Sequence, residues 1–271
     1  MKLMTRRKDE VKFKSKRELE LMRAAGRVTF KALQRGLEAA KPGMTTAQLD
    51  AIVHESYTAA GGVSVFKWYP SYVPHRTGSF PGNTCISINE QIVHGIPGDR
   101  VLLDGDVVKI DCGVRLAGYI GDSAVTILVG TPRPETQKLS DVTREALAIA
   151  IRETKPGRRW SDVARQMQHY VETLHGMACV RDFVGHGVGT HLHEEPKVPN
   201  FVSDDFLKRG DFYLQPGMTI AVEPMVCLGT HDFVMLDDGW TIITKDNRAA
   251  AHWEHTLAVT PTGCEILTDG S

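Results

Sequence analysis

The sequence has no apolar run long enough to cross a membrane, since no stretch of about 18 consecutive apolar residues occurs among its 271 residues. Its N-terminus also lacks the apolar core of a signal peptide. The net charge is only −1, so bulk charge predicts neither a DNA partner nor a membrane partner. With 42% hydrophobic and 24% charged residues, the composition is that of an ordinary globular protein. We therefore expect a cytoplasmic protein.

Cysteine is scarce and its spacing is irregular. The 5 cysteines are odd in number, lie far apart and never form a CxxC pair; they are Cys85, Cys112, Cys179, Cys227 and Cys264. This pattern argues against a disulfide framework and against a cysteine-based structural zinc site. It predicts reduced thiols in a reducing compartment.

One short segment departs from the neutral average. Residues 1–17 contain eight lysines and arginines but only two acids, Asp9 and Glu10. We interpret residues 1–14 as a basic, solvated N-terminal arm that precedes a single domain at residues 15–271. Contact of this arm with RNA or another polyanion is the alternative.

Helix signals begin directly after the arm. Residues 15–40 carry apolar side chains at helical spacing, with an irregularity expected near Gly26, and the segment ends at a Lys-Pro-Gly tripeptide. Thr45 and Gln48 have the spacing of a capping box and predict a second helix that ends at residues 61–62.

The same pattern returns later in the chain. A third helix is predicted at residues 139–154; it again ends at Lys-Pro-Gly and precedes a fourth helix. The two Lys-Pro-Gly tripeptides, and the helices after them, are 114 residues apart. Residues 104–108 likewise resemble residues 216–220 at an offset of 112. Two matches at nearly one offset indicate an internal duplication, with halves at about residues 15–130 and 131–268.

Two acids stand inside the most strand-like stretch, residues 107–129. Asp111 and Asp122 are surrounded by apolar and β-branched residues, where an unpaired carboxylate is costly to bury. If a hairpin turn centres on Leu116 and Ala117, the two acids lie directly opposite each other and need a shared proton or cation. The alternative is that the acids lie in solvated turns at the strand ends.

The duplication predicts a second acidic strand pair in the other half. Glu223 and Glu254 fit this prediction because both lie among strand-forming residues, with a longer excursion between them at residues 231–250. Four converging carboxylates require cations. His186, within a glycine-rich segment, is a fifth candidate ligand, and this carboxylate-rich set favours two divalent ions. A mononuclear zinc site of His186, His191 and His193 is the alternative.

These residues and their neighbours resemble a known family. The strings NEQIVHGIP, IDCGVRLAGYIGD, GHGVG, HEEP, EPM, TKD and EHT, in this order, are similar to those of bacterial type I methionine aminopeptidases over residues 15–268. The resemblance implies an α+β architecture, the pita-bread fold, in which two pseudo-twofold-related α/β halves surround a curved antiparallel sheet. It also implies removal of the initiator methionine from nascent chains with a small second residue, in a typically monomeric enzyme.

The resemblance assigns roles to individual residues. It implies two divalent ions (Co, Mn, Fe or Zn), with Asp111 on one ion, Asp122 and Glu254 bridging, and His186 and Glu223 on the other. Attack then comes from a metal-bridging hydroxide, with Glu223 as the proton shuttle. The residues implied to contact the substrate are His94, His193, Phe80, Cys85, Leu192 and Trp240, of which the two histidines are also catalytic.

The sequence departs from the family pattern at two places. Thr77 replaces an expected pocket aromatic, and His191 stands where a small residue is usual; we expect His191 to face solvent. Three further functions remain open: an aminopeptidase of the same fold that cleaves before proline, a non-catalytic module that binds protein or RNA, and a metallohydrolase that acts on a non-peptide amide. Within the resemblance, the basic arm is a candidate for ribosome contact.

Overall fold

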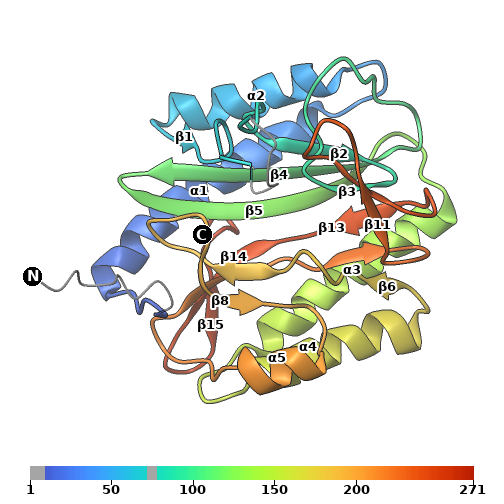
Figure 1. Cartoon of the computed structure of the whole chain (residues 1–271). Coiled ribbons are helices and arrows are strands. Elements are labelled where there is room, and N and C mark those ends of the chain that lie inside the picture. The colour runs from blue at the N-terminus through green and yellow to red at the C-terminus, as the bar shows by residue number, and fades with distance from the viewer. Residues whose placement is uncertain (1–9, 72–77) are drawn as a thin grey trace, which may run out of the picture.

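The computed structural model describes residues 10–71 and 78–271. Figure 1 shows two helix layers on opposite sides of a central group of antiparallel strands. The helices are α1 (Lys16–Ala39), α2 (Thr46–Ala59), α3 (Pro134–Glu153), α4 (Trp160–Gln168) with its π-helical continuation η1 (His169–Leu174), and α5 (Asp204–Arg209). In Figure 1, α1 and α2 lie above the strands, and α3, α4 and α5 lie below them.

The strands form four sheets within the described residues. In the first half they are β1 (Val63–Ser64), β2 (Cys85–Ile88), β3 (Gln91–Val93), β4 (Val107–Leu116) and β5 (Tyr119–Leu128). In the second half they are β6 (Ala178–Cys179), β7 (Gly185–Gly187), β8 (Glu194–Val198), β9 (Thr219–Val222), β10 (Met225–Cys227), β11 (Phe233–Met235), β12 (Ile242–Thr244), β13 (Ala250–His252), β14 (His255–Val259) and β15 (Cys264–Ile266).

Strand pairing places the β4–β5 hairpin of the first half beside the β9–β14 strand pair of the second half. The first sheet has the order β1-β4-β2, with β5 also paired to β4, and the largest has the order β15-β14-β9-β7-β8. The excursion predicted between Glu223 and Glu254 forms the β11–β12 hairpin, which pairs with β3. Strand β5 of the first half and β14 of the second half lie next to each other across the centre.

The first two helices form as the sequence predicts. Ser15 caps α1 in a reciprocal capping box with Glu18, and Thr45 caps α2 in the same way with Gln48. Each box satisfies two backbone groups that the helix itself leaves unpaired. The predicted starts of both helices are therefore confirmed, because capping depends on neighbouring residues alone.

The apolar spacing is irregular near Gly26, but α1 is continuous from Lys16 to Ala39. The glycine instead permits close packing. A Cβ atom on Gly26 would lie 1.9 Å from the carbonyl oxygen of Leu267, and one on Gly121 would lie 2.7 Å from the Gly26 Cα. Glycine at position 121 thus lets α1 pack closely on β5, and glycine at position 26 lets α1 approach the backbone at Leu267.

The third helix begins at Pro134, five residues before the predicted start at position 139. Its first turn, Pro-Glu-Thr-Gln, carries no apolar residue that a periodicity argument would detect, whereas proline is favoured in the first turn. Val163 and Met167 of α4 and Val171 of η1 are all fully buried, as expected from their spacing. They belong to apolar clusters beneath the second helix layer.

The register of the β4–β5 hairpin corrects the predicted pairing of its acids. Asp111 pairs with Ala124, and Asp122 pairs with Gly113, so the two acids are diagonal neighbours on one face. The turn centres on Ala117 and Gly118, which both have positive φ (48° and 87°). A two-residue turn of this kind favours glycine at its second position, which moves the register by two residues from the predicted one.

Candidate metal centre

The two acids of the first hairpin lie on the face of the sheet that points toward the second half. Asp122 is 3% exposed, and Asp111 lies opposite Cys85 of β2. Between them, Gly113 leaves space: a Cβ there would lie 2.5 Å from a Val65 side-chain atom and 3.2 Å from Asp122 Oδ1. The hairpin therefore presents both carboxylates without a side chain between them.

Glu223 and Glu254 lie opposite each other in the second half. Val222 pairs with His255 and Met225 pairs with His252, so a single register places the two glutamates face to face between these pairs. This agrees with the predicted acidic strand pair. The strands part at this point, which directs both carboxylates into the interior.

Hydrogen bonds join the two hairpins at the acids. The Thr256 hydroxyl donates to the Asp122 carbonyl oxygen (2.8 Å), and the Asp122 amide donates to the Thr256 hydroxyl (3.1 Å). The Ser123 hydroxyl donates to the Glu254 carbonyl oxygen (2.6 Å), and the Glu254 amide donates to the Ala124 carbonyl oxygen (2.9 Å). These bonds fix the backbones that carry Asp122 and Glu254 against each other.

His186 enters the same space from β7. A Cβ at Gly185 would lie 2.3 Å from the Ala221 carbonyl oxygen, so glycine allows β7 to approach β9 closely. The His186 Nδ1 donates to the Gly187 carbonyl oxygen at 2.9 Å. Its Nε2 lone pair then faces Asp122 Oδ2 at 3.7 Å and Glu223 Oε1 at 3.5 Å. An imidazole held in this way has the geometry of a metal ligand.

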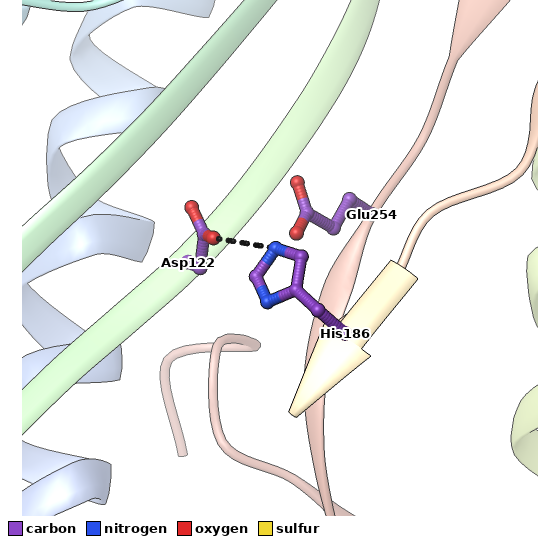
Figure 2. A group of neighbouring side chains, drawn as sticks. All are labelled: Asp122, His186 and Glu254. Atoms are coloured by element: carbon purple, nitrogen blue, oxygen red, sulfur yellow. Dashed lines mark ion pairs between the residues drawn. The ribbon is translucent and has the colours of Figure 1, made fainter. Parts of the chain in front are cut away.

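Figure 2 shows Asp122 of β5, His186 of β7 and Glu254, between β13 and β14, pointing toward one another. One ligand atom from each of the three lies within 4.8 Å of the others. Asp111 Oδ1 and Asp122 Oδ1 are buried and have no hydrogen-bond partner within the described part of the chain. Buried carboxylate oxygens without donors are the feature that a divalent cation satisfies, so the residues fit such an ion.

Burial raises the pKa of all four acids. The pKa of Asp122 rises to about 7 and that of Glu223 to about 8, because burial disfavours the charged form and, for Glu223, the neighbouring Asp122 adds repulsion. Burial and the surrounding carboxylates hold the pKa values of Asp111 and Glu254 well above their usual range. Divalent cations remove this penalty and displace the protons.

His252 is a further group at this centre that the sequence analysis did not identify. It is 2% exposed, and its Nε2 lies 3.8 Å from Glu223 Oε2 and 3.9 Å from Glu254 Oε2. Burial lowers its pKa to about 3, so the ring is neutral. The sequence could have indicated this residue, because it stands two positions before Glu254 in a strand-like segment and alternate residues of a strand share a face.

The acids and His186 form one wall of a cavity of about 550 Å³. The lining includes every residue proposed from the sequence, namely Asp111, Asp122, His186, Glu223, Glu254, His94, His193, Phe80, Cys85, Leu192 and Trp240. The remaining lining residues were not foreseen: Phe66, Tyr69, Asp182, Phe183, Val184 and Lys197. Three of these, residues 182–184, directly precede the glycine-rich His186 segment, which was the signal that could have indicated them.

The other end of the cavity is apolar. Phe80 and Trp240 meet edge to face with ring centroids 5.3 Å apart, and Cys85 and Leu192 are buried beside them. Burial raises the pKa of the Cys85 thiol well above its usual range, so this residue contributes a neutral, weakly polar surface. This end of the cavity therefore accepts an uncharged side chain.

Two histidines lie between the apolar end and the acids. Burial lowers the pKa of both His94 and His193 to about 4, so both rings are neutral at pH 7. The rings of His186 and His193 meet edge to face with centroids 4.3 Å apart. The two neutral imidazoles thus border the space between the carboxylates and the apolar pocket.

One of the two residues at which the sequence departs from the family pattern, His191, lies at the surface. The His191 side chain is 71% exposed, which confirms that it faces solvent. Within the described residues, His186 groups with Asp122 and Glu254 as a possible metal ligand and not with His191 and His193, which argues against the three-histidine zinc site. Thr77 falls outside the described residues.

Comparison with known proteins agrees with this geometry. The family model for metallopeptidase family M24 matches residues 20–261. The chain is 43% identical to methionine aminopeptidase 1 of Bacillus subtilis, an alignment that covers 94% of this chain and 98% of that protein. The crystal structure of methionine aminopeptidase from Thermotoga maritima has a TM-score of 0.88 at 39% identity and covers 96% of this chain and 99% of that one.

A more distant likeness concerns the fold alone. Prolidase from Pyrococcus furiosus has a TM-score of 0.72 at 22% identity, covering 96% of this chain and 66% of that one. The shared architecture is the pita-bread fold, as predicted from the sequence. The chain is a member of metallopeptidase family M24 and, within that family, belongs to the methionine aminopeptidases.

Proposed function

We propose that this metallopeptidase removes the initiator methionine from nascent polypeptides whose second residue is small. The observation that carries the proposal is the cavity, where a carboxylate-rich wall with His186 lies beside an apolar pocket bounded by aromatic rings. A thioether side chain is unbranched and soft, so it fits an irregular apolar pocket of this kind. The scissile bond then lies next to the acids.

The five acidic and imidazole ligands divide naturally between two divalent ions. Asp111 would hold one ion, Asp122 and Glu254 would be shared between the two, and His186 and Glu223 would hold the other. The ligand set suits Co, Mn, Fe or Zn. When bound, such ions supply Lewis acidity and a water of lowered pKa.

The side chains around the ions then handle protons and charge. Glu223 lies 3.5 Å from His186 Nε2 and lines the cavity, so it is placed to accept and return a proton near the scissile bond. His193 and His94 are neutral and donate hydrogen bonds to the substrate carbonyl as negative charge develops on its oxygen.

The preference for a small second residue follows from crowding. The His186 and His193 rings contact each other edge to face with centroids 4.3 Å apart, and we expect the residue beyond the scissile bond to lie against this pair. A bulky second side chain would have to displace one of these rings. Small residues such as alanine or serine avoid that cost.

We infer further that residues 15–271 form one catalytic domain made of two duplicated halves. Glycines that end equivalent segments support this inference, since Gly43 and Gly157 have φ values of 89° and 82°, and Gly105 and Gly217 have 86° and 92°. The pairs are separated by the offsets of 114 and 112 residues noted in the sequence. The halves at about 15–130 and 131–268 thus share their turn geometry.

The N-terminal arm has a more restricted role than its charge alone suggests. Lys14 belongs to the predicted solvated arm but is 9% exposed and forms an ion pair of 2.7 Å with Glu194. The Lys14 amide also donates to the Gly217 carbonyl oxygen. We propose that only the preceding basic residues are available for ribosome contact, in a monomeric cytoplasmic enzyme.

Within the described residues, no helix has the length and apolarity needed to span a membrane.

Metal titration of the stripped protein tests the proposal. Release of the first residue is followed in parallel from Met-Ala-Ser, Leu-Ala-Ser and Ala-Pro-Ala peptides as divalent ions are added. Selective methionine release that grows with metal loading supports the proposed substrate. Cleavage of the proline peptide would reassign the substrate, and absence of cleavage at every loading would favour a binding module.

A further inference from the structure

Tyr69 contacts a proposed catalytic histidine directly. Its hydroxyl oxygen lies 2.7 Å from His193 Nδ1, and the two rings meet edge to face at 89° with centroids 5.5 Å apart. Both side chains line the cavity that contains the acids. Tyr69 had no place in the sequence-based site, so this contact is additional to the proposed mechanism.

The backbone around Tyr69 is shaped to direct this side chain inward. The Tyr69 amide donates to the Phe66 carbonyl oxygen (2.8 Å), and the Phe80 amide donates to the Tyr69 carbonyl oxygen (2.9 Å). The preceding residue, Trp68, has a φ of 68°, and its side chain is 71% exposed. A left-handed conformation costs an L-residue about 1–2 kcal/mol, so other contacts must hold this strained turn in place.

The contact bears on which ring nitrogen of His193 carries a proton. A neutral imidazole has one N–H and one lone pair, and a hydrogen bond to one nitrogen selects the tautomer. His186 keeps its proton on Nδ1 because that atom donates to the Gly187 carbonyl oxygen. His193 requires the opposite arrangement, because only a proton on Nε2 lets that nitrogen donate to a substrate carbonyl.

We propose that Tyr69 is a positioning residue whose hydroxyl donates to His193 Nδ1 and thereby keeps the His193 proton on Nε2, facing the scissile carbonyl. This inference rests on the proposed role of His193 as a donor to the substrate. If the hydroxyl instead accepted a hydrogen bond from an Nδ1–H group, Nε2 would present a lone pair and would repel the carbonyl oxygen. Tyr69 thus complements His186, whose partner selects the metal-binding tautomer.

Replacing Tyr69 by phenylalanine tests the proposal while keeping the ring that packs on His193. Protein labelled with ¹⁵N-histidine is compared with and without diamagnetic Zn²⁺, and His193 is assigned with a His193→Gln variant. In the parent protein, His193 should show a pyridine-type Nδ1 and a pyrrole-type Nε2. In Tyr69→Phe, both signals should move toward intermediate values as the tautomers mix.

Kinetics provides the second measurement. Loss of one hydrogen bond that acts in the transition state should lower kcat about three- to tenfold with little change in KM. Tyr213→Phe is the matched control, because it removes a hydroxyl that accepts a hydrogen bond from Arg159 (3.0 Å) away from the cavity. The control should leave both the tautomer and kcat unchanged.

The outcomes separate this inference from the proposed function. A pyrrole-type Nδ1 in the parent protein, or unchanged signals and kcat in Tyr69→Phe, would overturn the role of Tyr69 while leaving methionine release intact. If the parent protein releases no methionine at any metal loading, the proposed function fails, and the tautomer measurement still decides whether Tyr69 sets the proton position.

Discussion

Replacing Asp122 by asparagine should weaken the effects of both pH and metal on stability. Without metal, the folded protein must bury four carboxyl groups whose pKa values are raised, that of Asp122 to about 7. Unfolding lets this group ionise near its ordinary value of 3.8. Folding is therefore favoured by the bound proton below about pH 4, and this contribution is lost as the pH rises through about 7.

The magnitude follows from the difference between the two pKa values. A change from 3.8 to about 7 corresponds to a loss of the order of 4 kcal/mol for metal-free protein between pH 4 and pH 8. Asparagine is uncharged throughout this range and removes the loss at that position. Metal-free Asp122→Asn should therefore be more stable than metal-free parent protein at pH 8 by a few kcal/mol.

Metal should cancel most of the variant's advantage at pH 8. A divalent ion at one hundred times its dissociation constant stabilises the folded state by about 2.7 kcal/mol, and the variant, which lacks a bridging carboxylate, should gain much less. Urea unfolding at pH 5 and pH 8, with chelator or with added Mn²⁺ or Zn²⁺, measures all four states. Asp141→Asn, an exposed acid on α3, is the control. If metal-free Asp122→Asn is less stable than the parent at pH 8, the reasoning is wrong.

Four further substitutions test the site and its supporting structure. Glu223→Ala should abolish both methionine release and tight metal binding, whereas His193→Ala should lower turnover by about 10²-fold or more with unchanged metal content, measured by elemental analysis. Gly26→Ala should lower the free energy of unfolding by at least about 2 kcal/mol, because its Cβ would lie 1.9 Å from the Leu267 carbonyl oxygen; an unchanged urea midpoint would contradict this contact. Lys109 is buried and its pKa is lowered to about 7, so parent stability should rise between pH 7 and pH 10 as the unfolded chain alone retains the proton. Lys109→Met should remove that rise, and a pH profile like that of the parent would contradict it.

The local features of this protein could be predicted from its sequence. The capping boxes at Ser15 and Thr45, the buried faces of the helices and the presence of acids inside strands all depend on neighbouring residues or on simple periodicity. The motif strings gave the family and hence the ligand set. Their order along the chain is a property of sequence alone.

Distances between elements were decided by the tertiary structure. The β4–β5 register depended on a two-residue turn at Ala117 and Gly118, and a shift of two residues changed Asp111 and Asp122 from direct to diagonal neighbours. Gly26, which periodicity marks as a defect in a helix, is instead the point where α1 crosses β5. Neither result follows from local propensity, because each depends on a segment far away in the chain.

The residues around the proposed ligands show the same difference between what the sequence predicts and what the tertiary structure decides. His252 and Tyr69 carry no motif of their own, yet the fold places one beside Glu223 and Glu254 and the other on His193. The sequence alone determined the proposed metal ligands, since chemistry restricts such ligands to a few residue types at fixed motifs. Only the tertiary structure decided how burial shifts their pKa values and which neighbours orient them, because both effects depend on packing between the two halves of the chain.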